Sequence, residues 1–211
     1  MTSFHLLLAF IFLQAGIPAP ALPQPISPPR FPLADAAPPT VKSAPSSKLL
    51  LGPVTVTFNK TTLSQAISQI GVGRIEHQGD AGESSYWICY SVNGPTRKER
   101  VWLLSHGEMG GPDHTIHGVA AQVVSSSAPD PSCPELPPNR RSLRLDSGIW
   151  LGAMSSEVRK RFGEPSLAKD SWLHYGSRRK FRGAFYEYGA LSARINAGSV
   201  VELWATLSVF D

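Results

Sequence analysis

The sequence predicts an α+β protein made of two tandem repeats, each a short helix packed on an antiparallel meander of three to four strands. Two segments of similar pattern, Tyr-Trp-Ile-Cys-Tyr at 86–90 and Ser-Trp-Leu-His-Tyr at 171–175, each follow a short helical pattern. In both halves, 37 residues separate the tryptophan of this segment from a valine that ends the predicted sheet, Val124 or Val209. Equal intervals of this kind indicate an internal duplication.

Each half opens with a short amphipathic helix. In the first half, apolar residues recur at i, i+3, i+4 and i+7, as Leu63, Ala66, Ile67 and Ile70. In the second, Ser155 is the expected N-cap, and Val158 and Phe162 form an i,i+4 apolar pair. Gly71 and Gly163 follow the two patterns and suit helix ends. Helices of about two turns are unstable alone, so both must pack on a sheet.

The segments outside the repeats differ from them in composition. Residues 6–13 are apolar and too short to span a membrane, and Ala19 and Ala21 form a small-x-small cleavage pattern, as in a secretory signal peptide. Ten of the 19 prolines then lie between Pro18 and Pro45, which favours an extended spacer. We therefore expect a signal peptide at 1–21, a proline-rich disordered linker at 22–48, repeats at 49–124 and 142–211, and a second linker at 125–141.

These segments place the protein outside the cytoplasm. No apolar run approaches the roughly 20 residues of a membrane-spanning helix, so no transmembrane segment is expected after signal cleavage. We expect a periplasmic or secreted protein. Cys89 and Cys133 are the two cysteines of the chain, and in an oxidising compartment they are expected to form a disulfide. The alternative is one buried and one reactive thiol.

The start of the second repeat carries a family resemblance. Gly-Ile-Trp-Leu-Gly-Ala-Met-Ser-Ser-Glu-Val at 148–158, Phe-Gly-Glu-Pro at 162–165 and Trp-Leu-His-Tyr at 172–175 resemble the helix-then-sheet unit of two bacterial envelope groups. These are the small outer-membrane-assembly lipoproteins and the β-lactamase-inhibitor proteins, the latter with two tandem copies. The resemblance implies binding or scaffolding through the sheet. The chain departs from these groups in lacking a lipid-attachment cysteine and in having only one possible disulfide.

Alternation along the last strand predicts a candidate partner-binding face. Val201, Leu203, Ala205, Leu207 and Val209 form one apolar side, expected to meet the helix. The opposite side should then carry Trp172, His174, Arg194 and Trp204. Tryptophan and arginine are typical of interaction hot spots. The alternative is that the other repeat or a linker covers these tryptophans.

A histidine-rich segment at 105–117 predicts a second, different kind of site. Its candidate metal ligands are His106, Glu108, Asp113, His114 and His117, and such nitrogen and carboxylate donors suit zinc. Their spacing matches no known metal motif, so a polar hairpin tip is the competing interpretation and we expect no cofactor. No nucleophile elbow, phosphate-binding glycine loop or His-Glu-x-x-His motif is present, so no enzyme is predicted.

The net charge is +4, and positive residues cluster in two basic segments. They occupy matching places in the two halves and comprise Arg97, Lys98 and Arg100, and Arg178, Arg179, Lys180 and Arg182. Such segments serve solubility or weak attraction to anionic surfaces. Nucleic acid is not an expected partner, because the chain has no recognised nucleic-acid module.

The sequence as a whole predicts an exported, non-enzymatic protein-binding or scaffolding module of the bacterial cell envelope with a protein partner of unknown identity. The alternative is a metal-binding module or metal-dependent enzyme centred on 106–117.

Overall fold

The computed structural model describes residues 25–32, 39–80, 83–107, 113–125 and 129–210. Most of the described chain is β-structure, in an eight-stranded antiparallel sheet of order β3-β4-β5-β6-β11-β10-β9-β8 and a three-stranded sheet of order β2-β1-β7. The strands are β1 (Lys48–Leu51), β2 (Val54–Thr57), β3 (Glu76–Gln78), β4 (Ser85–Asn93), β5 (Lys98–His106), β6 (Gly118–Val124), β7 (Leu143–Leu145), β8 (Leu167–Lys169), β9 (Trp172–Arg182), β10 (Phe185–Asn196) and β11 (Ser199–Phe210). The helices are α1 (Leu63–Ile70), α2 (Ser155–Phe162) and a 3-10 turn, η3 (Pro138–Arg140).

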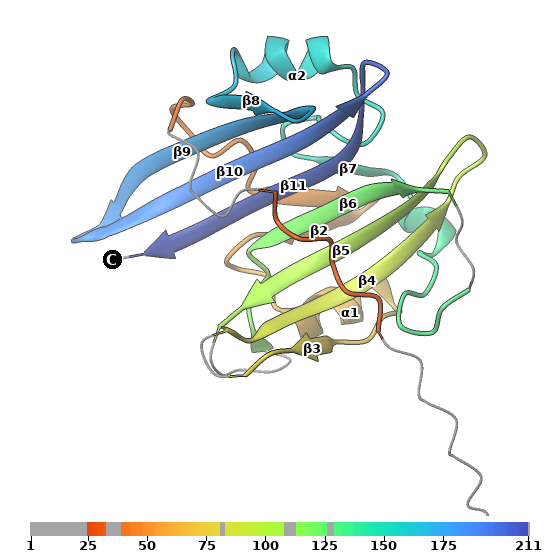
Figure 1. Cartoon of the computed structure of the whole chain (residues 1–211). Helices are drawn as coiled ribbons and strands as arrows, with labels where there is room; N and C mark the ends of the chain where they lie inside the picture. The colour runs from red at the N-terminus through yellow and green to blue at the C-terminus, as the bar shows by residue number, and fades with distance from the viewer. Residues whose placement is uncertain (1–24, 33–38, 81–82, 108–112, 126–128, 211) are drawn as a thin grey trace, which may run out of the picture.

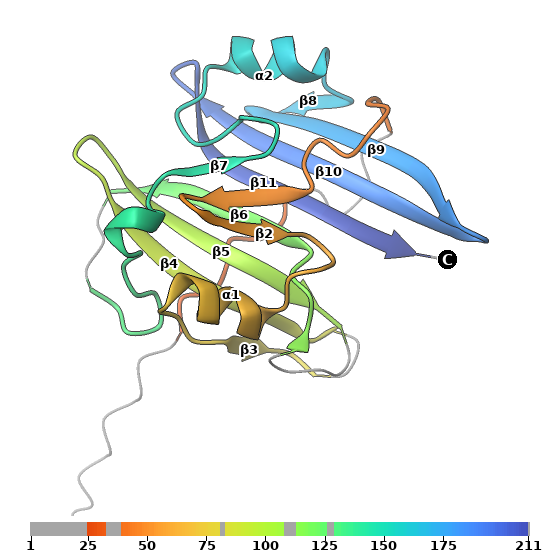
Figure 2. The ribbon, with the colours of Figure 1, turned by 180° about the vertical axis from the view of Figure 1, so that it is seen from behind.

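The two faces of the large sheet have different coverings. Both α-helices and the three-stranded sheet lie on one face, which we call the helix face (Figure 2). The opposite face is crossed by the first described residues, drawn in red over β4, β5 and β6 (Figure 1). None of the helices in the described part of the chain is long and apolar enough to cross a membrane.

The main hydrophobic core fills the helix face. Leu63 from α1, Val158 from α2 and Leu191 and Leu203 from the large sheet are fully buried there. The Thr62 side chain accepts a hydrogen bond from the Gln65 N–H and caps α1, while Gly71 ends it in the left-handed conformation. The N-cap of α2 is Met154, one residue before the predicted Ser155, and its N–H donates to Glu157. The predicted short helices and their packing face are therefore present.

The predicted fold class, two tandem helix-plus-meander repeats, is wrong. The strands of both halves belong to one sheet, because β6 pairs with β11 from Glu202↔Gln122 to Thr206↔Gly118. A second sheet brings together β1 and β2 from the first half and β7 from the second. The physical reason is that a strand edge has unpaired N–H and C=O groups, and here the edges of two meanders satisfy each other. The result is a mostly β protein with two antiparallel sheets.

Gly52, in the turn between β1 and β2, is expected to be one of the least replaceable glycines. Its φ is +56°, and a Cβ there would overlap the carbonyl oxygen of Asn139. Gly71 has a φ of +90°, but a Cβ added there would meet no neighbouring atom within 4 Å, so it is the matched control for backbone strain alone. We expect Gly52→Ala to cost about 2–4 kcal/mol of unfolding free energy and Gly71→Ala about 1 kcal/mol. Urea unfolding measures both, and equal losses would contradict the clash.

Candidate functional site

An aromatic cluster lines the face of the large sheet opposite the helices. We call this surface the aromatic face. The buried residues of the cluster on it are Trp87, Cys89, Trp102, Leu104, Ala120, Cys133 and Trp204. Strand pairing sets them side by side, since Cys89 lies opposite Trp102, and Ala120 lies between Trp102 and Trp204. Alternation sends every second residue to this face. The small side chain of Ala120 leaves space for the two indoles on either side.

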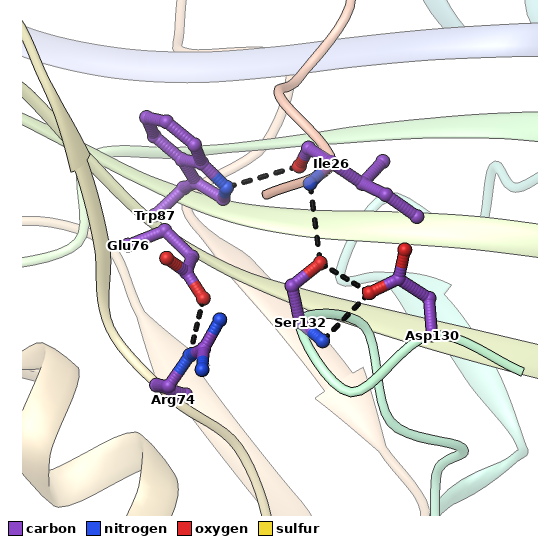
Figure 3. A network of polar contacts seen from close by, with 6 residues as sticks. All are labelled: Ile26, Arg74, Glu76, Trp87, Asp130 and Ser132. Atoms are coloured by element: carbon purple, nitrogen blue, oxygen red, sulfur yellow. Dashed lines mark hydrogen bonds and ion pairs between the residues drawn. The ribbon is translucent and has the colours of Figure 1, made fainter. Parts of the chain in front are cut away.

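Residues 25–32, Pro-Ile-Ser-Pro-Pro-Arg-Phe-Pro, cross the aromatic face, and we call them the proline strap. The carbonyl oxygen of Ile26 accepts hydrogen bonds from the indole N–H groups of both Trp87 and Trp102, each at 3.1 Å. Figure 3 shows the first of these bonds from close by. At the other end of the strap, the Phe31 ring lies edge-on to Trp204, with 5.2 Å between ring centroids. Part of the predicted 22–48 linker is thus packed on the sheet.

The loop after β6 holds the strap from its side. The N–H of Ile26 donates to Ser132 Oγ at 3.1 Å, and the Ser132 hydroxyl donates to Asp130 at 2.6 Å (Figure 3). This bond lowers the pKa of the Asp130 carboxyl. The Ser132 N–H also donates to Asp130, at 2.7 Å, so this serine is fixed from two sides. The strap is therefore bonded through both the N–H and the C=O of one residue.

The predicted disulfide between Cys89 and Cys133 is confirmed. It joins β4 to the loop that carries Ser132, next to the buried Trp102. Two backbone bonds align the same loop with β4, from the Ser91 N–H to the Pro134 carbonyl and from the Leu136 N–H to the Ser91 carbonyl. The disulfide thus fixes the loop from which Ser132 reaches the strap.

The four predicted partner-binding residues all lie on the aromatic face, with different exposure. Trp204 is 5% exposed and His174 is 3% exposed, whereas Trp172 is half-buried and Arg194 is exposed. His174 contacts Ser192 Oγ through Nδ1 at 2.8 Å, and burial lowers its pKa. Arg194 pairs with Glu202 at 3.0 Å. The alternative in which a linker covers a tryptophan therefore describes Trp204, which contacts Phe31.

Sequence reasoning missed Ile26, Phe31, Trp87 and Trp102 as site residues. Trp87 and Trp102 are buried, at 1% exposure each, and both occupy alternating positions of adjacent strands. The signal that identifies them is that Trp87 and Cys89 alternate onto one face of β4, and that pairing β4 with β5 puts Trp102 opposite Cys89 on the same face. No sequence signal points to Ile26, because its contribution is a backbone carbonyl.

The predicted metal ligands are divided between the two faces. The rings of His106 and His117 lie 4.5 Å apart on the aromatic face, whereas His114 packs on Tyr86, whose neighbours belong to the helix-face core. Asp113 contacts Ser64, and Glu108 lies outside the described residues. Within the described ranges, no three His, Cys, Asp or Glu side chains are grouped so that they could hold a metal ion.

Burial of the His117 ring predicts an acid-sensitive stability. Burial is the largest cause that lowers the pKa of His117 from 6.5 to about 3, and electrostatic repulsion from His106 and His114 lowers it further. The unfolded chain therefore binds more protons than the folded chain between pH 6.5 and about 3, so stability falls as the pH drops through this range, by up to about 1.4 kcal/mol per pH unit. We expect His117→Gln to flatten the wild-type decline in urea midpoint between pH 6.5 and 4. Parallel pH curves for the two proteins would contradict this.

The basic residues are engaged to different degrees. Arg97 pairs with the buried Glu99, which also accepts from the Trp150 indole at 3.0 Å. Arg179 pairs with Glu187, an interaction that raises the pKa of its guanidinium. Arg178 instead lies over the Tyr186 ring, 4.0 Å from its centroid. Of the remaining predicted residues, Lys98 and Lys180 are exposed, Arg100 is half-buried, and the side chain of Arg182 lies outside the described part.

Comparison of the chain with family models, with curated proteins and with solved structures finds no match. The resemblance to the bacterial envelope groups therefore stays a prediction.

Proposed function

We propose that this protein is an exported, non-enzymatic binding protein of the cell envelope that holds an extended, proline-containing segment of a protein partner on its aromatic face. The observation that carries the proposal is the convergence of two indole N–H groups, from Trp87 and Trp102, on the single carbonyl oxygen of Ile26. The strap is a ligand of this chemistry held in cis, and a partner segment takes its place in trans.

Proline chemistry explains why such a face selects such a ligand. Proline has no N–H and fixes its own φ, and it also biases the preceding residue towards extended backbone. A segment such as 25–32, with prolines at 25, 28, 29 and 32, is therefore ordered at low entropic cost and presents carbonyl acceptors. Aromatic grooves recognise polyproline segments in this way, with the rings packed on the prolines.

The aromatic face also continues beyond the strap, which gives a partner more surface than the strap covers. Tyr186 and Tyr188 are six and four residues before Ser192 on β10, and even spacing along a strand puts them on the same face as Ser192, the aromatic face. Tyr188 contacts Phe210, which is 58% exposed, and Arg178 lies over both tyrosines. Exposed aromatic residues beside arginine are typical of protein interaction surfaces. A partner longer than the strap reaches this cluster of Arg178, Tyr186, Tyr188 and Phe210.

Export is supported by the confirmed disulfide, because such bonds persist in oxidising compartments.

Binding of a proline-containing segment to the aromatic face is tested with a fluorescent peptide of residues 22–33 added to the full chain. In the wild type the strap competes at the high effective concentration of a tethered ligand, so the peptide should bind weakly. Phe31→Ala removes the strap's contact with Trp204 and should raise peptide affinity about tenfold. A peptide with its prolines replaced by alanine is the matched control and should bind less. Equal binding of both peptides, or no gain in Phe31→Ala, would contradict the proposal.

The partner is captured with a photo-crosslinking amino acid at position 210, at the exposed end of the aromatic face. The matched control is Lys160, which is exposed on α2, on the opposite face. We expect an adduct from position 210 that the 22–33 peptide suppresses, and none from position 160. Adducts that are equal at both positions, or that the peptide leaves unchanged, would show that the aromatic face is not the binding surface.

A further inference from the structure

A cavity lies between the proline strap and the large sheet. Its volume is about 360 Å³, which falls in the range of small-molecule sites. Its apolar walls are Phe31 and the strap prolines on one side and Trp87, Leu104 and Trp204 on the other. The tertiary contact of Phe31 with Trp204 closes one part of this space. The strap thus covers one side of a cavity whose walls are largely apolar and aromatic.

Two buried ring nitrogens at this cavity have no hydrogen-bond partner among the described residues. They are Trp204 Nε1 and His117 Nε2, and both residues line the cavity. The neighbouring indoles differ, since Trp87 and Trp102 both donate to Ile26. A buried N–H without a partner is costly, and native structures rarely keep one without a reason. A bound molecule with an oxygen acceptor would satisfy Trp204.

The charges around the cavity favour an anion. Arg30 lines the cavity with His106 and His117, and none of the described lining residues is Asp or Glu. Burial lowers the pKa of both histidines, so near neutral pH they serve as neutral donors or acceptors and Arg30 carries the positive charge. An indole N–H and a guanidinium are both donors, and a carboxylate accepts from both.

We propose that this cavity binds a small aromatic carboxylate, with its ring beside the Phe31–Trp204 pair against Trp87 and Leu104 and its carboxylate accepting from Trp204 Nε1 near Arg30. Because Arg30 and Phe31 of the strap line this site, it forms with the strap in place and needs no partner. A partner segment that displaces the strap would remove both residues from the site.

The site is tested on the full chain with 2-naphthoate as the probe, followed by the indole N–H signals in ¹⁵N spectra. We expect the Trp204 signal to move downfield and to saturate. The Trp150 signal is the internal control, because that indole donates to Glu99 on the helix face and should stay in place. The matched probes are 2-naphthalenemethanol and 2-naphthylmethylamine, which keep the rings and change the charge. Binding of the amine as tight as that of the carboxylate would overturn the proposal.

Two variants separate the donor from the charge. Trp204→Phe keeps an aromatic wall and removes the N–H, and it should weaken 2-naphthoate binding about tenfold or more, as expected for a hydrogen bond to a charged group. Arg30→Gln should remove the preference for the carboxylate over the alcohol. The Trp87, Trp102 and Trp150 signals report whether each variant is folded. Unchanged 2-naphthoate affinity in a folded Trp204→Phe variant, or a Trp204 signal that does not move, would refute the site.

Discussion

Replacing both Cys89 and Cys133 with alanine is expected to lower the free energy of unfolding by about 4 kcal/mol. The bond spans a sequence separation of 44 residues, and in the chain-entropy model a closed loop of this size restricts the unfolded chain by about that amount. Both cysteines are buried, so alanine avoids placing a new polar group in the aromatic cluster. Urea unfolding of the oxidised wild type and of the double variant measures the difference. Equal midpoints and slopes would contradict it.

The same substitution should release the proline strap, because the bridged loop carries Ser132, which accepts from the Ile26 N–H. Arg30 is exposed in the strap and is a trypsin site, so native-state cleavage after Arg30 should be faster in the double variant. Ser132→Ala is the matched control, since it removes the strap contact and keeps the disulfide. It should accelerate cleavage with a much smaller loss of stability. If cleavage is unchanged in both variants, Ser132 does not hold the strap.

Several strands could be predicted from the sequence because alternation is a strong local signal. The alternating residues 201–209, expected as the last strand, lie within β11, and 172–175 begins β9. Leu203, Ala205 and Leu207 are buried on the helix face as predicted, whereas Val209 is 37% exposed. Val209 is near the end of the last strand, beyond the reach of the helices. Periodicity thus predicts which face of the sheet a residue lies on. It does not predict how far along the strand that face is buried.

The sheet order could not be predicted, because it depends on contacts between distant edges. Alternation within β6 and β11 carries no information about which strand pairs with which, yet their ladder merges the strands of the two halves into the large sheet. The three-stranded sheet is built from strands of four, four and three residues. Such short strands give too few alternating positions for a periodic signal.

The proline strap shows a different limit of sequence reasoning. Composition measures what a segment can bury by itself, and residues 25–32 are too rich in proline to form a core. It does not register packing against another part of the chain, such as the contact of Phe31 with Trp204. Alternation places Trp204 on the correct side of its strand, yet the covering segment lies more than 170 positions earlier in the sequence. The aromatic face is therefore predictable in part, and its occupant is not.

Trp102→Ala is expected to lower the free energy of unfolding by about 3–5 kcal/mol, the usual loss for a buried large aromatic residue. Trp102 is 1% exposed and lies between the disulfide and Ala120, so neighbours cannot close the space without moving a strand. Trp102→Phe keeps much of the apolar ring and should cost far less. Urea unfolding compares the two, and similar losses would show that packing at this position contributes little.

The double replacement of Trp87 and Trp102 by phenylalanine should show a loss larger than the sum of the two single losses. Each single variant leaves the Ile26 carbonyl with one indole donor, whereas the double variant leaves it with neither. An unsatisfied buried carbonyl costs about 1–3 kcal/mol, and this cost appears only when both donors are gone. The excess in a double-mutant cycle therefore measures the shared acceptor. Faster trypsin cleavage after Arg30 in the double variant alone would assign that energy to the strap, and additive losses would show that the two donors act independently.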